Sequence, residues 1–84
     1  MEIIFSKHAK DQMIERNISK DDILSVILNP DKIIRQSAGR SRVIKSIRKN
    51  NKDYLLITVF SQINPEQKKI ITAFLTSKTN KYSK

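Results

Sequence analysis

The spacing of apolar side chains divides the chain into a helical first third and a strand-rich remainder. Apolar residues recur at helical spacing between residues 9 and 14 and again between residues 23 and 28. From residue 32 onward they form strand-length runs rich in β-branched and aromatic side chains. The pattern predicts a brief edge strand over 2–5, two helices, and four further strands over 32–36, 41–49, 54–61 and 68–76.

Capping residues set the ends of both predicted helices. Ser6 can accept a hydrogen bond from the first turn of the first helix, and Asn17 follows where a left-handed residue commonly ends a helix. Ser19 and Asp22 have the spacing of a capping box. Pro30 ends the second helix, because the residue before a proline is pushed out of the helical region.

Burial and turn chemistry together predict the fold class. Ala9, Met13 and, at its flank, Ile14 are expected on the buried side of the first helix, and the nearly continuous apolar run 54–60 predicts a central strand buried on both sides. Loops as short as those between the strands permit only neighbouring antiparallel pairing. We therefore predict one α+β domain over 1–84, with two helices packed on one face of a four-stranded antiparallel meander and a short N-terminal strand available to join an edge.

The last predicted strand passes into a basic, hydroxyl-rich end. Alternate residues of a strand share a face, so residues 71, 73 and 75 are expected to face the core, and Ile70, Thr72, Phe74 and Thr76 the other side. Thr72 and Thr76 would then lie at a surface that a ligand can reach. Lys78, Lys81 and Tyr82 follow with charge and one ring, a combination that suits a phosphate-rich partner.

Charge is unevenly distributed along the chain. The 84 residues include 17 Lys and Arg against 8 Asp and Glu, a net charge of +9. Residues 1–31 hold four basic and six acidic side chains, a net −2, so the remainder carries +11. This segregation favours binding of a polyanion over the alternative, a lysine surplus that serves solubility. The chain has no cysteine, no apolar run long enough to span a membrane and no signal peptide at its start, so we expect a soluble, cytoplasmic protein.

Candidate catalytic and binding residues lie at the start of the first helix and in the strands. His8, the only histidine, falls in the first helical turn and is a candidate general base, although a lone histidine is more often an ordinary surface residue. Arg42 is the best candidate for gripping a phosphate, because its guanidinium can bind two oxygens at once. The basic set in which it lies also comprises Arg40, Lys45, Lys68, Lys69, Lys78 and Lys81.

Strand geometry and composition restrict the chemistry. Arg42 and Lys45 have opposite parity in one strand, so both face one ligand only if a bulge intervenes. Asp21 and Asp22 already serve the helix start, and Gly39, the only glycine, excludes a phosphate-cradling glycine loop. We expect neither a metal nor a cofactor. Metal-free cleavage of RNA remains feasible, because the 2′-hydroxyl of the substrate is itself the nucleophile.

Four segments and two tail residues resemble, in order, a family of small prokaryotic proteins called domain of unknown function 4258. They are Ser6–Ala9, Glu15–Ser19, Asn29–Asp31 and Thr72–Lys78, with Lys81 and Tyr82. That family is similar to the barnase, EndoU, colicin and RelE-like ribonuclease toxins, which share two N-terminal helices followed by a four-stranded antiparallel sheet. Asn17 stands where glycine is more usual in the family.

The resemblance implies a metal-independent ribonuclease that is the toxin of a toxin and antitoxin pair. It implies an active site of His8, Arg42 or Arg40, Thr72 and Thr76. Together with the basic cluster and the tail, this predicts RNA binding by Arg40, Lys45, Lys78, Lys81 and Tyr82. The partners would be RNA, free or ribosome-bound, and an acidic antitoxin protein. Two alternatives remain: a non-catalytic basic module that binds nucleic acid, and a protein whose basic face only docks an acidic partner.

Overall fold

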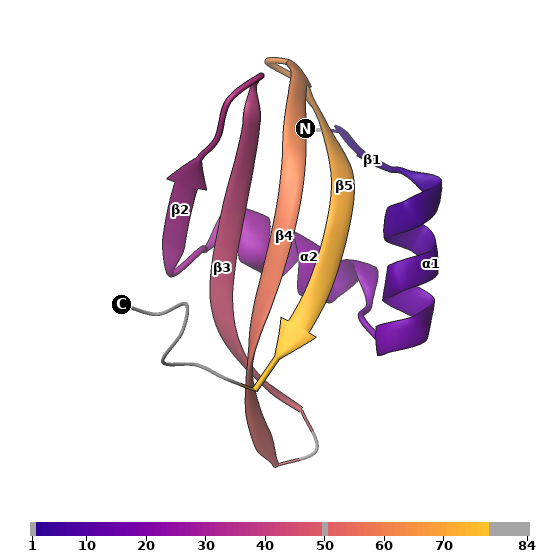
Figure 1. The fold of residues 1–84 in the computed structure, drawn as a ribbon, viewed down its shortest axis with the longest axis vertical. Helices are drawn as coiled ribbons and strands as arrows, with labels where there is room; N and C mark the ends of the chain where they lie inside the picture. The colour runs from indigo at the N-terminus through magenta and orange to yellow at the C-terminus, as the bar shows by residue number, and fades with distance from the viewer. Residues whose placement is uncertain (1, 50, 78–84) are drawn as a thin grey trace.

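The computed structural model describes residues 2–49 and 51–77, which form two helices and five strands (Figure 1). The helices are α1 (Lys7–Arg16) and α2 (Lys20–Leu28). The strands are β1 (Glu2–Phe5), β2 (Lys32–Arg35), β3 (Arg40–Lys49), β4 (Lys52–Asn64) and β5 (Gln67–Thr76). The predicted α+β class is confirmed, and β4 extends beyond the predicted strand at both ends.

All five strands form one sheet in the order β1-β5-β4-β3-β2. The strands β2 to β5 pair as the predicted antiparallel meander. β1 pairs with β5 in the parallel direction, from Glu2 opposite Gln67 to Phe5 opposite Ile70. The sheet is therefore five-stranded and mixed, and the prediction of a purely antiparallel four-stranded sheet was incomplete. A parallel pair needs a long crossover, and here the two helices and the meander supply it.

Local capping forms the helices as the sequence predicts. The Ser6 hydroxyl accepts from Ala9 N at 3.0 Å, and Asn17 adopts a left-handed conformation with φ of 55°. Ser19 and Asp22 form a reciprocal capping box. In Figure 1, α2 crosses behind the sheet and α1 lies beside β5. No helix among the described residues is long and apolar enough to cross a membrane.

The core has two parts, one on each side of the sheet. The larger part lies between helices and sheet and includes Ala9, Met13, Ile23, Val26, Val43, Leu56, Phe60, Ile70 and Ala73. The smaller part lies on the opposite side and comprises Ile44, Leu55 and Ile57, with Ile34 and Phe74 packed against them. β4 is buried on both sides from Leu55 to Phe60, which confirms the predicted central strand. Ile14 was wrongly expected to be buried: its side chain is 82% exposed.

A bulge in β5 corrects one part of the predicted facing pattern. Thr72 pairs with Val59 and Ile70 pairs with Phe60, so Ile71 is an extra residue between consecutive pairs. The extra residue turns Ile70 into the helix-side core, where it is fully buried, instead of onto the face that carries Thr72. The predicted alternation of side chains between the two faces is therefore correct for residues 72–76 and wrong for Ile70.

Candidate functional site

The pairing register assigns polar and apolar residues to the side of the sheet that faces away from α2, which we call the helix-free face. Directly opposed residues of neighbouring strands point to the same side. Four consecutive rows across β3, β4 and β5 form the central part of this face: Arg40–Ser61–Lys69, Arg42–Val59–Thr72, Ile44–Ile57–Phe74 and Ser46–Leu55–Thr76. The prediction that Thr72 and Thr76 share a face is confirmed, and Arg40 and Arg42 share it with them.

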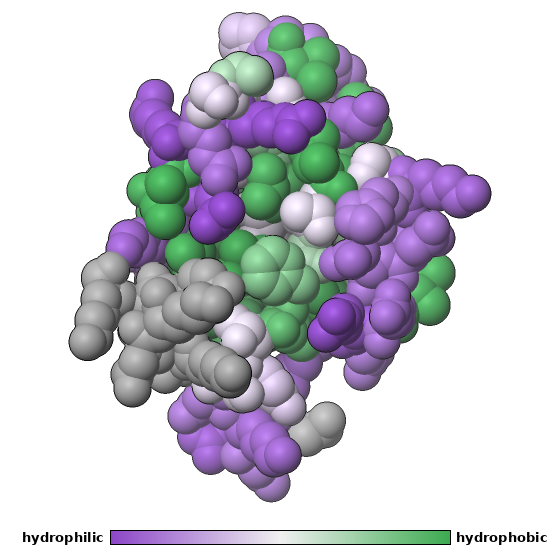
Figure 2. Space-filling view, viewed as in Figure 1, coloured by the Kyte–Doolittle hydropathy of each residue, from purple (hydrophilic) through white to green (hydrophobic). Residues whose placement is uncertain are grey.

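These four rows contain no carboxylate, and their charges lie in the first two rows. Arg40 and Lys69 belong to the first row and Arg42 to the second, whereas the third row is entirely apolar. Figure 2 shows apolar side chains gathered in the middle of the visible face, with hydrophilic side chains around them. A cationic end beside an apolar centre with one aromatic ring, Phe74, can accommodate both the phosphates and the bases of a nucleic acid.

Arg42 carries a buried donor without a partner on this face. Its side chain is half-buried, and its Nε is buried with no hydrogen-bond partner in the described part of the chain. Its cross-strand neighbours on either side are apolar, Ile34 on β2 and Val59 on β4. A buried donor on a charged group without an acceptor destabilises the protein. An anion bound at this row would supply the missing acceptor.

The start of α1 is fixed to β5 next to this row. The Ser6 hydroxyl that caps α1 also donates to Ile71 O at 3.0 Å, and Ser6 N donates to Ile70 O at 3.0 Å. The carbonyl of the bulge residue is therefore bonded to the helix cap. His8, two residues beyond Ser6, is exposed in the first turn of α1 as predicted, and Thr72 directly follows Ile71.

The predicted basic set is divided between the two sides of the sheet. The register of β3 has no bulge, so Lys45 faces away from Arg42, and its Nζ donates to Asn29 O at 2.8 Å. Lys68 also lies on the helix side, with its Nζ 5.1 Å from the centre of the Phe60 ring. The opposite facing that strand parity predicts for Arg42 and Lys45 is therefore confirmed, and Lys45 lies apart from the helix-free face. Its assignment to RNA binding stays a prediction. Lys78, Lys81 and Tyr82 lie outside the described residues.

Carboxylates lie mainly among the helices and at the margins of the sheet. Asp22 pairs with Lys49 at 2.8 Å. Partial burial raises the pKa of Asp22, but the hydrogen bonds from Lys49 and Ser19 and the Lys49 charge outweigh it and bring the pKa below its ordinary value. Asp31 accepts from Ser46 N at 2.7 Å. Within residues 2–49 and 51–77 no three His, Asp or Glu side chains form a group that could hold a metal ion.

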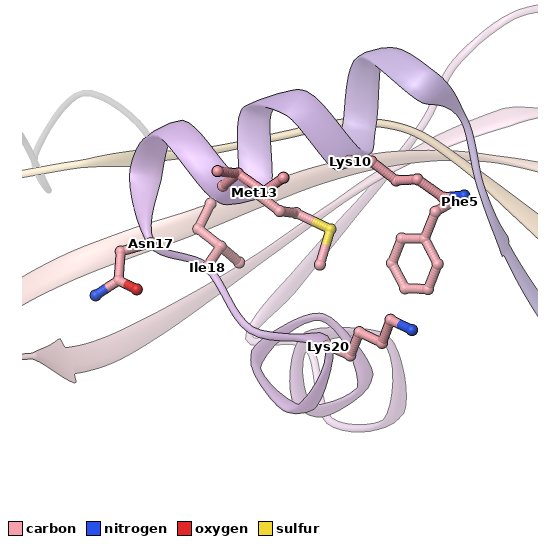
Figure 3. Close-up of a pocket in the computed structure, with 7 residues that line it drawn as sticks. Phe5, Lys10, Met13, Asn17, Ile18 and Lys20 are labelled. Carbon is pink, nitrogen blue, oxygen red and sulfur yellow. The ribbon is translucent and has the colours of Figure 1, made fainter.

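Two of the depressions in the described structure were not identified from the sequence, and the second of them reaches the first helix-free row at Arg40. The α1–α2 groove, of about 490 Å³, is lined by Phe5, Lys10, Met13, Ile14, Asn17, Ile18 and Lys20. In Figure 3 the side chains of Phe5, Met13 and Ile18 converge on the space between α1 and the start of α2. The hairpin pocket, of about 420 Å³, is lined by Ile33, Arg35, Gln36, Gly39, Arg40, Ser41, Phe60, Gln62 and Lys68. The basic residues on either side of the predicted turn at Gly39 were the sequence feature that could have indicated the hairpin pocket.

A comparison with models of known protein families identifies the family of this chain. Residues 5–75 match the model of the family described as a domain of unknown function, DUF4258. The chain belongs to this family. The match covers both helices and nearly all of the sheet, including His8, Arg42 and Thr72. No curated protein and no solved structure matches the chain. The DUF4258 description assigns no activity, so the roles of these residues stay predictions.

Proposed function

We propose that this DUF4258 protein is a metal-independent RNA endonuclease whose substrate lies across the helix-free face. One observation carries the proposal: the buried, unpartnered Nε of Arg42 lies in the same sheet row as Thr72. The two residues are separated by one intervening strand, which corresponds to about 10 Å between backbones. A scissile phosphate between them would accept from the guanidinium on one side and from the Thr72 hydroxyl on the other.

The proposed reaction uses the nucleophile that RNA itself carries. His8 removes the proton of the 2′-hydroxyl, the 2′ oxygen attacks the adjacent phosphorus, and the bond to the 5′ oxygen breaks. The leaving oxygen takes a proton from solvent, and the products end in a 2′,3′-cyclic phosphate and a 5′-hydroxyl. Arg42 stabilises the charge that develops on the phosphorane oxygens, and Thr72 and Thr76 position the phosphate. DNA lacks the nucleophile and should not be cleaved.

The attachment of α1 to β5 supports the role of His8. Ser6 bonds to both Ile70 and Ile71, so the first turn of α1 is held at the edge of the strand that carries Thr72. The proposal requires the exposed imidazole on this turn to reach the substrate from the edge of β5. A general base held in this way contributes about 10²–10⁴-fold to the rate of a proton-transfer step.

The decisive experiment is cleavage of a labelled oligoribonucleotide by the purified protein with EDTA present. We expect wild type to cleave it, to leave 2′,3′-cyclic phosphate ends and to spare the matching DNA. His8→Ala should abolish cleavage, whereas Lys7→Ala, which changes the exposed neighbour in the same turn, should not. Circular dichroism must show that both variants are folded. Equal cleavage by wild type and His8→Ala would remove His8 from the reaction.

The second candidate function is non-catalytic binding of nucleic acid, which the cationic end of the helix-free face would support without His8. In that case wild type and His8→Ala bind RNA equally and cleave nothing, even on ribosomes. Arg42→Gln then weakens binding and makes its salt dependence less steep, since fewer counterions are released.

The α1–α2 groove supports the further proposal that an acidic partner protein binds and silences the enzyme. Ile14 is 82% exposed beside an apolar floor, and Lys10 and Lys20 line the same groove. An apolar side chain flanked by carboxylates matches this combination. We expect expression to arrest growth and co-expression of an adjacent small acidic protein to relieve the arrest. Ile14→Asp should prevent the relief but not the arrest; relief of Ile14→Asp equal to wild type would exclude the groove.

A further inference from the structure

We propose that the hairpin pocket binds the phosphate group of a nucleotide, at a place separate from the Arg42–Thr72 row. The pocket lies where the β2–β3 and β4–β5 hairpins meet, at the end of the sheet shown uppermost in Figure 1. Gln62 N donates to Gly39 O at 3.2 Å and joins the two hairpins there. The volume of the hairpin pocket, about 420 Å³, is within the range of small-ligand sites.

The charge of the hairpin pocket favours an anion. Arg35 on β2, Arg40 on β3 and Lys68 on β5 all line it, and none of the residues that line it is acidic. The three cations come from three different strands, so the sheet fixes the spacing of the backbones that carry them. Two guanidinium groups and one ammonium offer both forked and single donors, which suits the three oxygens of a terminal phosphate.

Lys68 is already held in position within the pocket. Its Nζ donates to Gln62 Oε1 at 2.6 Å and lies 5.1 Å from the centre of the Phe60 ring. The Gln62 amide is itself fixed, because its Nε2 donates to Asn64 O at 2.6 Å and to Gln67 O at 3.0 Å. An ammonium group has three N–H donors, so two remain for a ligand after the bond to Gln62. Such preorganisation lowers the entropy lost on binding.

The remaining lining residues favour a nucleotide over a bare phosphate ion. Ile33 and Phe60 supply apolar surface, and Gln36 and Ser41 carry groups that can bond to a ribose or a base edge. Gly39 has φ of +71°, and nothing lies within 4 Å of the position that a Cβ would occupy there. The backbone of the turn is therefore open to close approach by a ligand.

A titration of ¹⁵N-labelled wild-type protein tests the site without any substitution. Gly39 is the only glycine, so its amide signal is a single internal reporter of the pocket. We expect adenosine 5′-monophosphate to shift the Gly39 signal, and adenosine, which lacks the phosphate, to shift it only at concentrations at least tenfold higher. A phosphate group of this kind occurs both in a free nucleotide and in an RNA strand, so a short 2′-O-methyl oligoribonucleotide is titrated in parallel.

Matched variants assign the shift to the cations. Arg35→Gln combined with Lys68→Gln should raise the dissociation constant at least tenfold for whichever ligand binds. Lys10→Gln, which removes one charge from the α1–α2 groove, should leave it unchanged. A response to the mononucleotide identifies a free nucleotide as sufficient, and a response to the oligonucleotide alone identifies a strand. If neither ligand moves the Gly39 signal, or if the double variant binds as Lys10→Gln does, the proposal is overturned.

The site does not depend on the proposed cleavage. The 2′-O-methyl strand has no free 2′-hydroxyl and cannot be cut by the proposed reaction, so the titration reports binding alone. If the hairpin pocket binds neither ligand, the proposed roles of His8 and Arg42 are still tested separately by the RNA cleavage assay.

Discussion

Two polar side-chain atoms are buried without a hydrogen-bond partner in the described part of the chain, and they lie on opposite sides of the sheet. Thr58 Oγ1 belongs to a fully buried residue of β4, between Val43 and Ala73 and beneath the helices. Arg42 Nε belongs to a half-buried residue of β3 on the helix-free face. No ligand reaches the first atom without unfolding the core. The second belongs to a half-buried residue on the face to which we assign the substrate, so our proposal gives a functional meaning to the second atom only.

Two lysines on the helix side of the sheet also have a structural role. On the helix side, β3 supplies a lysine to the C-terminal cap of each helix: Lys49 Nζ donates to Asn17 O at 2.6 Å and Lys45 Nζ donates to Asn29 O at 2.8 Å. Cations are favourable at helix C-termini, so these two charges stabilise the fold. Part of the positive surplus therefore has a structural explanation. Within residues 2–49 and 51–77, we assign nucleic-acid binding only to cations of the helix-free face and the hairpin pocket.

The largest expected effect compares adjacent leucines that face opposite sides of the sheet. Leu56 is fully buried in the large helix-side core, and Leu55 is 3% exposed in the small core of the helix-free face. Leu56→Ala should lower the free energy of unfolding by about 4 kcal/mol and Leu55→Ala by about 2 kcal/mol, because the smaller cluster can relax around the deletion. Urea denaturation measures both. Equal losses would show that the two cores are equally constrained.

Arg42→Gln should reduce RNA cleavage on the order of 10²–10³-fold, the effect expected when one donor to a developing anionic charge is removed. The Tm should not fall, because the substitution removes a buried, unsatisfied charged donor. Arg48→Gln is the matched control. Arg48 lies on the same strand with the parity of Arg42, but it is 69% exposed and lies 3.9 Å from Asp53. If both variants retain full activity, the row of Arg42 and Thr72 is not the site of cleavage.

The sequence predicted those parts of the molecule that depend on residues close together in the chain. Both helix starts follow from serine hydroxyls, and the end of α1 follows from Asn17, whose side chain tolerates the left-handed conformation. The nearly continuous apolar run identified β4 as central. The shared face of Thr72 and Thr76 followed from period-two alternation.

The features that the sequence did not predict depend on pairing between distant segments. The bulge at Ile71 arises from the register between β4 and β5 and from the bond to Ser6, 65 positions away. Strand alternation alone therefore misplaced Ile70. Likewise, Lys45 became a helix-capping residue only because β3 passes beneath the end of α2. The pocket around Arg35 and Lys68 required two hairpins to meet.

A smaller effect is expected from the atom buried on the helix side. Thr58→Val replaces an unpaired hydroxyl by a methyl group of similar size and should raise the free energy of unfolding by about 1 kcal/mol. The same change at Thr72, which is half-buried on the helix-free face, should change stability by less than about 0.5 kcal/mol and should weaken RNA cleavage. Thermal unfolding and the cleavage assay separate the two outcomes. A loss of stability in Thr58→Val would mean that the hydroxyl has a partner in solution.

The smallest expected effect concerns the ion pair that ties α2 to β3. The pKa of Asp22 is lowered in the folded state, so its carboxylate stabilises the fold at pH values above the unfolded pKa of about 3.9, and this contribution disappears as the pH falls through the folded pKa. Asp22→Asn should therefore be less stable than wild type at pH 7, by less than about 1 kcal/mol because the pair is only partly buried. The difference should shrink towards zero in acid. Asp21→Asn, an exposed change in the same turn, controls for the general effect of removing a carboxylate from the start of α2. Parallel stability curves for wild type and Asp22→Asn from pH 7 down into the acid range would show that Lys49 contributes to the fold through its bond to Asn17 and not through its charge on Asp22.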